Sequence, residues 1–185
     1  LVEEALRLCK EMNMTDAVLG DIGTGSGCIA ISLASNLPQA RFVASDISQN
    51  ALDIAQKNAV THKVDSRISF IKSDLLEKIE GEHFDALVAN LPYIGQSEDH
   101  LVDKDVALHE PSTALYGGPT GVEIIERLLE QVAERAQKPK WLIGEMGFSQ
   151  KSQITTLIQK YFPMARVEWK TDLAGLDRFF IVYFA

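Results

Sequence analysis

Cysteine is scarce in this sequence of 185 residues, which contains only Cys9 and Cys28. Neither has a histidine or second cysteine at metal-ligand spacing, so we expect no bound metal. Both lie in apolar segments, where we expect them to pack as small hydrophobic residues in a reducing compartment. No apolar run approaches the roughly 20 residues that span a bilayer, and no signal-peptide pattern opens the chain. We therefore expect a cytoplasmic protein that does not contact membranes.

Positive charge is also in short supply. The chain carries 18 Lys and Arg residues against 26 Asp and Glu residues, a net charge of −8, and the basic residues are scattered singly. Such a surface repels phosphate backbones, which counts against a nucleic-acid substrate without excluding one. The sequence begins at Leu1 rather than at a methionine, so we expect a fragment of a longer protein.

The chain is long enough for one domain, and its 46% hydrophobic and 24% charged residues are ordinary for a globular protein. Apolar spacing predicts helices over 2–12, 28–37, 122–136 and around 154–161, and another that begins after Ser48 as N-cap, with Leu52, Ala55 and Ala59 on its buried face. Strands are predicted over 17–21, 41–45, 67–72, 84–89, 141–147, 167–170 and 179–184.

Strand and helix alternate five times before two strands follow each other closely. This order predicts an α/β fold: one doubly wound, mainly parallel seven-stranded sheet with one antiparallel strand. Residues 95–119 show no periodicity, so we expect an irregular functional loop there, partly disordered without substrate. Trp141 and Trp169 lie in strand patterns and are expected in the core.

A glycine-rich stretch follows the first predicted strand, where such sheets bind ligands. It begins at Asp21 and continues through Gly23, Thr24, Gly25, Ser26 and Gly27. Glycines allow a backbone to approach a ligand closely. Acidic residues also end the next two strands, at Asp46 and at Asp74 with Leu75 beside it. A carboxylate at the second strand end is well placed to accept hydrogen bonds from ribose hydroxyls.

Two cofactors compete for this stretch. Residues 25–30 match the dinucleotide pattern with its permitted final Ala. The alternation of glycines after Asp21 instead resembles the S-adenosylmethionine loop of class I methyltransferases. A pyrophosphate would be disfavoured beside the Asp21 carboxylate, so this residue favours S-adenosylmethionine. A tight turn that binds nothing is the third reading.

The fourth predicted strand stops at Asn90, Leu91, Pro92 and Tyr93. An Asn-Pro turn is one explanation. The alternative is chemical, because an Asn side chain has an acceptor that can hold the N–H group of a planar amide or amine. An Asn-Pro-Pro-Tyr-like tetrapeptide at this place resembles the motif of methyltransferases that act on planar nitrogen. Here Leu91 replaces the first Pro of that motif.

Further segments resemble one family, the peptide chain release factor glutamine N5-methyltransferases. They are Glu110-Pro111, residues 114–121 and residues 170–178. The resemblance covers essentially the whole chain and implies that residues 1–185 are the catalytic domain, without the family's helical N-terminal substrate-recognition domain. It implies a monomer that takes S-adenosylmethionine, releases S-adenosylhomocysteine (SAH) and methylates a glutamine amide nitrogen of a release factor.

The resemblance also implies roles for the strand-four residues. The acceptors for the substrate amide would be the Asn90 side-chain oxygen and the Leu91 backbone carbonyl, which Pro92 biases toward extended geometry. The Tyr93 ring would pack against the amide, and the cofactor would contact the glycine loop, Asp46, Asp74, Leu75 and Asn90. Two alternatives stay open: methylation of an amino group on a DNA or RNA base, and a silent cofactor-binding module. Asp177 and Arg178 are expected to order a loop or to form a surface ion pair.

Overall fold

We describe a computed structural model that covers residues 1–96 and 112–184. The helices are α1 (Val2–Glu11), α2 (Cys28–Asn36), α3 (Gln49–Thr61), η1 (Asp65–Arg67), α5 (Ser112–Leu115), α6 (Glu123–Glu134) and α7 (Lys151–Tyr161). The strands are β1 (Val18–Ile22), β2 (Arg41–Asp46), β3 (Ile68–Lys72), β4 (Ala86–Ala89), β5 (Ile94–Gly95), β6 (Tyr116–Gly118), β7 (Trp141–Glu145), β8 (Arg166–Thr171) and β9 (Asp177–Tyr183).

Seven of these strands form one sheet in the order β3-β2-β1-β4-β7-β9-β8. The first five in that order run parallel, and β9 is antiparallel to both of its neighbours. The predicted doubly wound sheet with one antiparallel strand is thus confirmed. Because β1 and β4 lie side by side at the centre, the order reverses there, and the ends of these strands form the place where such sheets bind ligands.

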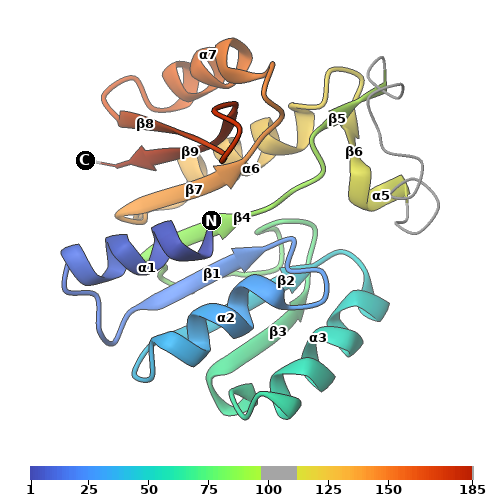
Figure 1. The fold of residues 1–185 in the computed structure, drawn as a ribbon, viewed down its shortest axis with the longest axis vertical. Helices are drawn as coiled ribbons and strands as arrows, with labels where there is room; N and C mark the ends of the chain where they lie inside the picture. Colours follow the sequence, from blue (N-terminus) through green and yellow to red (C-terminus); the bar gives the residue numbers. More distant parts are fainter. Residues whose placement is uncertain (97–111, 185) are drawn as a thin grey trace.

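Alternate residues of each strand face opposite sides of the sheet and pack into two separate hydrophobic cores. Val88 and Ile143 pack with α1 and α2 on one side, whereas Leu87 and Leu142 pack with α6 and α7 on the other. The molecule therefore has three layers, with the sheet in the middle (Figure 1). No helix in the described part of the chain is long and apolar enough to cross a membrane.

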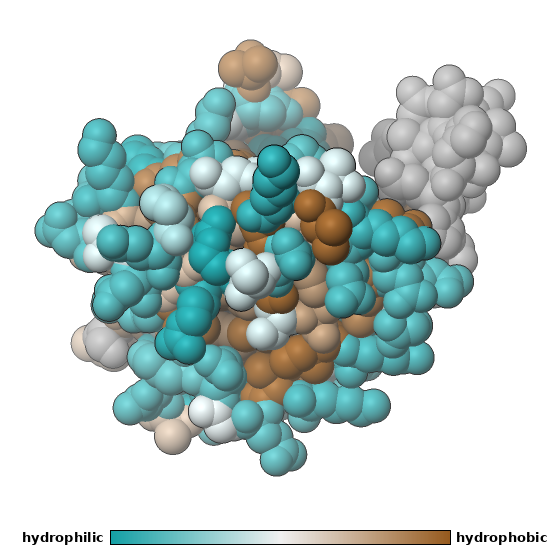
Figure 2. All heavy atoms as spheres, turned by 90° about the horizontal axis from the view of Figure 1, so that it is seen from below, coloured by the Kyte–Doolittle hydropathy of each residue, from teal (hydrophilic) through white to brown (hydrophobic). Residues whose placement is uncertain are grey.

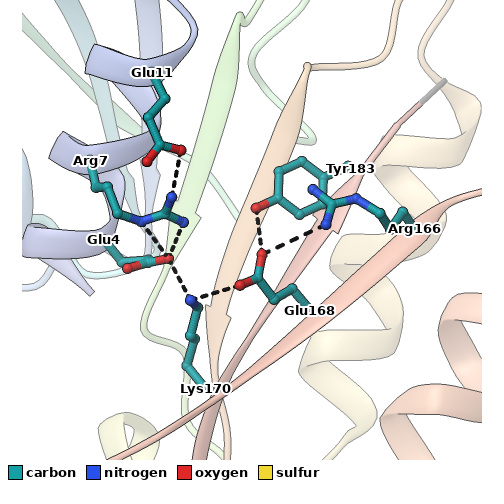
Figure 3. A network of polar contacts seen from close by, with 7 residues as sticks. All are labelled: Glu4, Arg7, Glu11, Arg166, Glu168, Lys170 and Tyr183. Carbon is teal, nitrogen blue, oxygen red and sulfur yellow. Dashed lines mark hydrogen bonds and ion pairs between the residues drawn. The ribbon is translucent and has the colours of Figure 1, made fainter.

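Helix α1 is tied to the far edge of the sheet by charged side chains (Figure 3). Lys170 of β8 lies 3.1 Å from Glu4 and 2.7 Å from Glu168, and Glu4 also pairs with Arg7. The Tyr183 hydroxyl of β9 donates to Glu168 at 2.8 Å. Strand β3 forms the opposite edge of the sheet. Figure 2 views the molecule from this side, where hydrophilic residues surround a smaller hydrophobic area.

Several local predictions need correction. Residues 95–119 were expected to be irregular, but the described part contains α5 and β6, and β6 pairs with β5 in a second, two-stranded sheet. Cys28 is exposed rather than packed, because it starts α2 at the outer face of the first turn, while Cys9 is buried as expected. Ala136 lies beyond the end of α6 and is exposed. Trp141 is fully buried, whereas Trp169 on the edge strand β8 is only half-buried.

Candidate active site

The predicted site residues meet at one edge of the sheet. In the register of the parallel strands, Ile22 at the end of β1 lies beside Ser45 of β2 and Ala89 of β4, and Asp46 lies beside Lys72 of β3. The segments that follow these strands therefore emerge together at their carboxyl ends (Figure 1). The structure thus brings together predicted site residues that lie as far apart in the sequence as Asp21 and Asn90.

The loop between β1 and α2 depends on its glycines. Gly23, Gly25 and Gly27 have φ values of +74°, +57° and +86°, a region that residues with a Cβ rarely occupy. The N–H groups of Gly23 and Thr24 both donate to the Ser45 carbonyl at 2.9 Å, which fixes the loop to β2. A Cβ at Gly25 would meet no atom within 4 Å, so the loop leaves open space above this residue.

Asp21 lies beneath this loop and is only 1% exposed. Its Oδ2 accepts hydrogen bonds from the Thr24 hydroxyl at 2.6 Å and from the Ala30 N–H at 2.9 Å. Its Oδ1 is buried and has no hydrogen-bond partner among the described residues. Burial raises the pKa of Asp21 to about 6. A buried carboxylate with one unused oxygen suits a ligand that brings a hydrogen-bond donor or a positive charge.

The second strand end supports the loop from the side. Asp46 is half-buried, and its two carboxylate oxygens accept from the N–H groups of Gly25 and Ser48, each at 2.8 Å. Each oxygen retains acceptor capacity, so these bonds leave room for a ligand hydroxyl. Ser26 is exposed, and its carbonyl accepts from Asn58 of α3 at 2.9 Å.

The third strand end differs from the expectation in detail. Asp74 reaches the same edge, but its carboxylate accepts a hydrogen bond from Arg127 of α6 at 2.7 Å. Leu75 is buried and has a φ of +51°, which is rare for a residue with a branched side chain. Its carbonyl accepts from the buried Ser45 hydroxyl at 3.2 Å. The surrounding structure therefore holds a strained backbone beside the site.

The segment after β4 lies directly against the glycine loop. Asn90 is exposed, whereas Leu91 is buried at 5% exposure. A Cβ at Gly23 would come within 2.8 Å of Leu91 Cδ2 and 3.8 Å of the Asn90 carbonyl. The Leu91 side chain thus packs into the core beneath the loop and leaves Asn90 at the surface beside it.

Tyr93 is fixed by residues that sequence reasoning did not connect with it. Its hydroxyl donates to Glu145 at the end of β7, at 3.1 Å, and the positive charge of Arg178 acts on it from nearby. Burial and the neighbouring Glu145 carboxylate raise the pKa of Tyr93 above its usual value, so the phenol stays protonated at neutral pH. The only signal for Glu145 in the sequence was its place at a strand end.

The carboxyl-terminal hairpin reaches this group of residues through Arg178. Arg178 pairs with Asp172 at 3.1 Å, and Asp172 accepts from the N–H groups of Ala174 and Leu176 within its own loop. Asp177 pairs with Lys151 of α7 at 3.0 Å. Arg178 thus holds the residue that orders this loop and Asp177 forms an ion pair, which are the two kinds of contact expected from the sequence. Glu110 and Pro111, and most of the loop expected to be disordered, lie outside the described residues.

Comparison with known proteins agrees with this arrangement. The fold is that of class I methyltransferases: a ribosomal protein L11 methylase from Lactobacillus delbrueckii subsp. bulgaricus superposes with a TM-score of 0.68 at 20% identity, over all of this chain and 79% of that one. The N-terminal domain of human METTL16, solved in complex with SAH, has a TM-score of 0.69 at 16% identity, covering all of this chain and 67% of that one.

Comparison of the sequence identifies the family to which the chain belongs. Residues 5–110 match the methyltransferase small domain, and the chain belongs to this family. A release factor glutamine methyltransferase from Koribacter versatilis is 40% identical over 85% of the chain, and one from Bradyrhizobium diazoefficiens is 38% identical over 96%. The resemblance stated from the motifs is thereby confirmed. The chain spans 55% and 60% of the lengths of these two relatives.

Proposed function

We propose that residues 1–185 form a catalytic domain that transfers a methyl group from S-adenosylmethionine to the side-chain amide nitrogen of a glutamine in a peptide chain release factor. The observation that carries this proposal is the position of Asn90, exposed beside a glycine loop in a chain whose curated relatives are named release factor glutamine methyltransferases.

The proposed cofactor fits the loop between β1 and α2. S-adenosylmethionine supplies an electrophilic methyl group on a sulfonium, and its amino-acid end carries an ammonium. The unpartnered Oδ1 of Asp21 suits that positive charge, and the open space above Gly25 leaves room for the chain of the cofactor. The proposed contacts of the cofactor are Asp21, Gly23, Thr24, Gly25, Ser26, Gly27, Asp46, Asp74, Leu75 and Asn90.

The nucleoside end of the cofactor would lie toward β2 and β3. Asp46 retains acceptor capacity for ribose hydroxyls, because each of its two oxygens accepts one backbone hydrogen bond. The Asp74 carboxylate is already paired with Arg127, so we assign it a smaller contribution to cofactor binding than Asp46. Its contribution comes from its position beside the strained backbone of Leu75.

The strand-four residues would supply the chemistry on the acceptor side. A glutamine amide nitrogen is a poor nucleophile, since its lone pair is delocalised into the carbonyl. Two acceptors that engage its N–H groups, the Asn90 side-chain oxygen and the Leu91 carbonyl, orient the lone pair and stabilise positive charge that develops on nitrogen. Pro92 restricts the backbone at Leu91, and Tyr93 forms a wall for the amide. The raised pKa of Tyr93 argues against its use as a base.

Label transfer tests the proposal against its alternatives. The chain is incubated with S-adenosylmethionine labelled in the methyl group and with a release factor, double-stranded DNA or RNA in separate reactions. We expect label on the release factor alone. Label on nucleic acid would support the base-methylating alternative. SAH binding without transfer to any of the three acceptors would support a silent cofactor-binding module.

A further inference from the structure

Gln150 is a buried polar side chain that lies far from the predicted motifs in the sequence. It lies in the turn between β7 and α7 and is only 1% exposed. Its Oε1 accepts from the Gly147 N–H at 2.9 Å, and its Nε2 donates to the Tyr93 carbonyl at 2.6 Å and approaches the Thr120 carbonyl at 3.5 Å. The amide therefore joins the turn to the segment after β4, across 57 residues of sequence.

The turn does not need this side chain to close. The Gln150 N–H donates to the Gly147 carbonyl at 3.0 Å, and the Ile154 N–H donates to the Gln150 carbonyl at 3.0 Å, so backbone bonds already form the turn and begin α7. Burying a long amide costs free energy unless its groups are hydrogen-bonded. Of the bonds that the buried amide adds, the shortest is the one from Nε2 to the Tyr93 carbonyl, which leads out of the turn.

Two glycines also lie against the backbone of the Pro92–Tyr93 segment. A Cβ at Gly121 would come within 2.3 Å of the Tyr93 carbonyl oxygen and 2.6 Å of Gln150 Nε2. A Cβ at Gly117 would come within 2.5 Å of the Pro92 carbonyl oxygen. These glycines allow β6 and the loop after it to contact the strand-four segment closely.

The exposed Asn90 thus belongs to a segment that is fixed at two points. Leu91 is held by the core beneath the glycine loop, and the Tyr93 carbonyl is held by Gln150. Residues that orient a reacting group affect turnover strongly, because small displacements remove the productive geometry. We propose that Gln150 is a positioning residue, which holds the Asn90–Tyr93 segment in place through the Tyr93 carbonyl. This inference rests on the proposed function.

Two variants of similar size to glutamine test the hydrogen bond to the Tyr93 carbonyl separately from the packing of the side chain. Gln150→Glu keeps the shape and the acceptor for Gly147 but, when ionised, cannot donate to Tyr93. When protonated, its hydroxyl regains a donor. Gln150→Met keeps the length and cannot donate at any pH. We expect each to lower kcat by about 10- to 100-fold near neutral pH, with the dissociation constant for SAH nearly unchanged. As pH falls, Gln150→Glu should recover relative to the parent, while Gln150→Met should not.

A matched control uses Arg67, whose guanidinium donates to the carbonyls of Leu37 and Ala34 at the opposite edge of the sheet. Arg67→Met also removes side-chain donors to backbone carbonyls, and it should lower stability without the selective loss of kcat. The inference is overturned if both Gln150 variants keep the parental kcat, or if SAH binding falls in proportion to turnover, as expected for a purely structural role.

Hydrogen exchange makes the test independent of the acceptor. We expect faster amide exchange in residues 90–96 of both Gln150 variants and unchanged exchange in residues 23–27. If the parent methylates no release factor, the proposed function fails, and exchange alone decides the inference: unchanged exchange in residues 90–96 would overturn it. If one variant does not fold, the other gives the same comparison.

Discussion

The side chain of Leu91 occupies the space beside the Cα of Gly23, where a Cβ would come within 2.8 Å of Leu91 Cδ2. This contact joins the proposed cofactor loop to the proposed catalytic segment. The resembling motif has proline at this position, and here the core anchors the leucine side chain instead.

A double-mutant cycle measures this contact. Gly23→Ala should lose about 2 to 4 kcal/mol of unfolding free energy, because it adds both backbone strain and overpacking. Gly25→Ala also has a positive φ but would meet no atom, so it should lose only about 1 kcal/mol. In a Leu91→Ala background the cost of Gly23→Ala should shrink by about 1 kcal/mol or more in urea titrations. Additive losses would show that the contact does not couple the two segments.

Asn90→Ala should separate chemistry from binding. Asn90 is exposed, so its loss should leave the thermal unfolding midpoint nearly unchanged. Removal of one of two proposed amide acceptors should lower kcat by about 10²- to 10³-fold. Calorimetry with SAH should show a much smaller change in the dissociation constant, because nine other residues share the proposed contacts with the cofactor. A variant that methylates at the parental rate would rule out the assigned role of Asn90.

The affinity for SAH should depend on pH through Asp21. An ammonium binds the ionised carboxylate, and the pKa of Asp21 is raised to about 6, so affinity should increase by about tenfold between pH 5 and pH 7. Asp21→Asn should weaken binding and remove this dependence. The stability of the fold should depend on pH in the opposite direction to the affinity for SAH. Since an unfolded Asp titrates near 3.9, the unfolded chain loses this proton first, and the contribution of Asp21 to stability falls between about pH 4 and pH 6. Parental SAH affinity that is flat over this range would contradict the assignment.

The network around Lys170 should stabilise the attachment of α1 (Figure 3). Lys170→Met should cost about 1 kcal/mol at neutral pH, and less at high salt. The pKa values of Glu4 and Glu168 are lowered, chiefly by hydrogen bonds from Arg7 and Lys170 respectively. Their contribution is therefore present above the unfolded pKa near 4.3 and is lost as pH falls through the folded pKa values.

Urea titrations of Lys170→Met at pH 7 and pH 3 check this sign. The difference from the parent should shrink at pH 3. Lys160→Met is the control, because Lys160 pairs with Glu126 on the surface and is more exposed, and it should show no measurable loss. Equal losses in the two variants at neutral pH would argue against a special role for the network.

Where local patterns and tertiary packing agree, the sequence predicted the structure. Ser48 caps α3 by accepting from the Ala51 N–H, and Leu52, Ala55 and Ala59 form its buried face, as expected from their spacing. Phe84 fits the strand pattern and is buried, yet β4 begins only at Ala86. Hydrophobicity alone predicted burial there but not the start of strand pairing.

What the sequence could not show arises from contacts between distant segments. Gln150 stands in the turn between β7 and α7, and nothing local indicates that its amide reaches Tyr93. Strands β5 and β6 are two and three residues long and contain glycine, so they lack the period of a strand. Asp74 ends a strand as predicted, but its partner Arg127 lies 53 residues away. A motif thus predicted which residues gather at the site, but not what holds them.

The position of the transferred methyl group tests the central proposal most directly. After incubation of the chain with S-adenosylmethionine and a release factor, fragment-ion mass spectrometry of the digested substrate would locate the modification. We predict one added methyl group on the side-chain nitrogen of a single glutamine, lost when that glutamine is replaced by asparagine. A methyl group on another residue type, or none on the release factor while nucleic acid becomes methylated, would contradict the account.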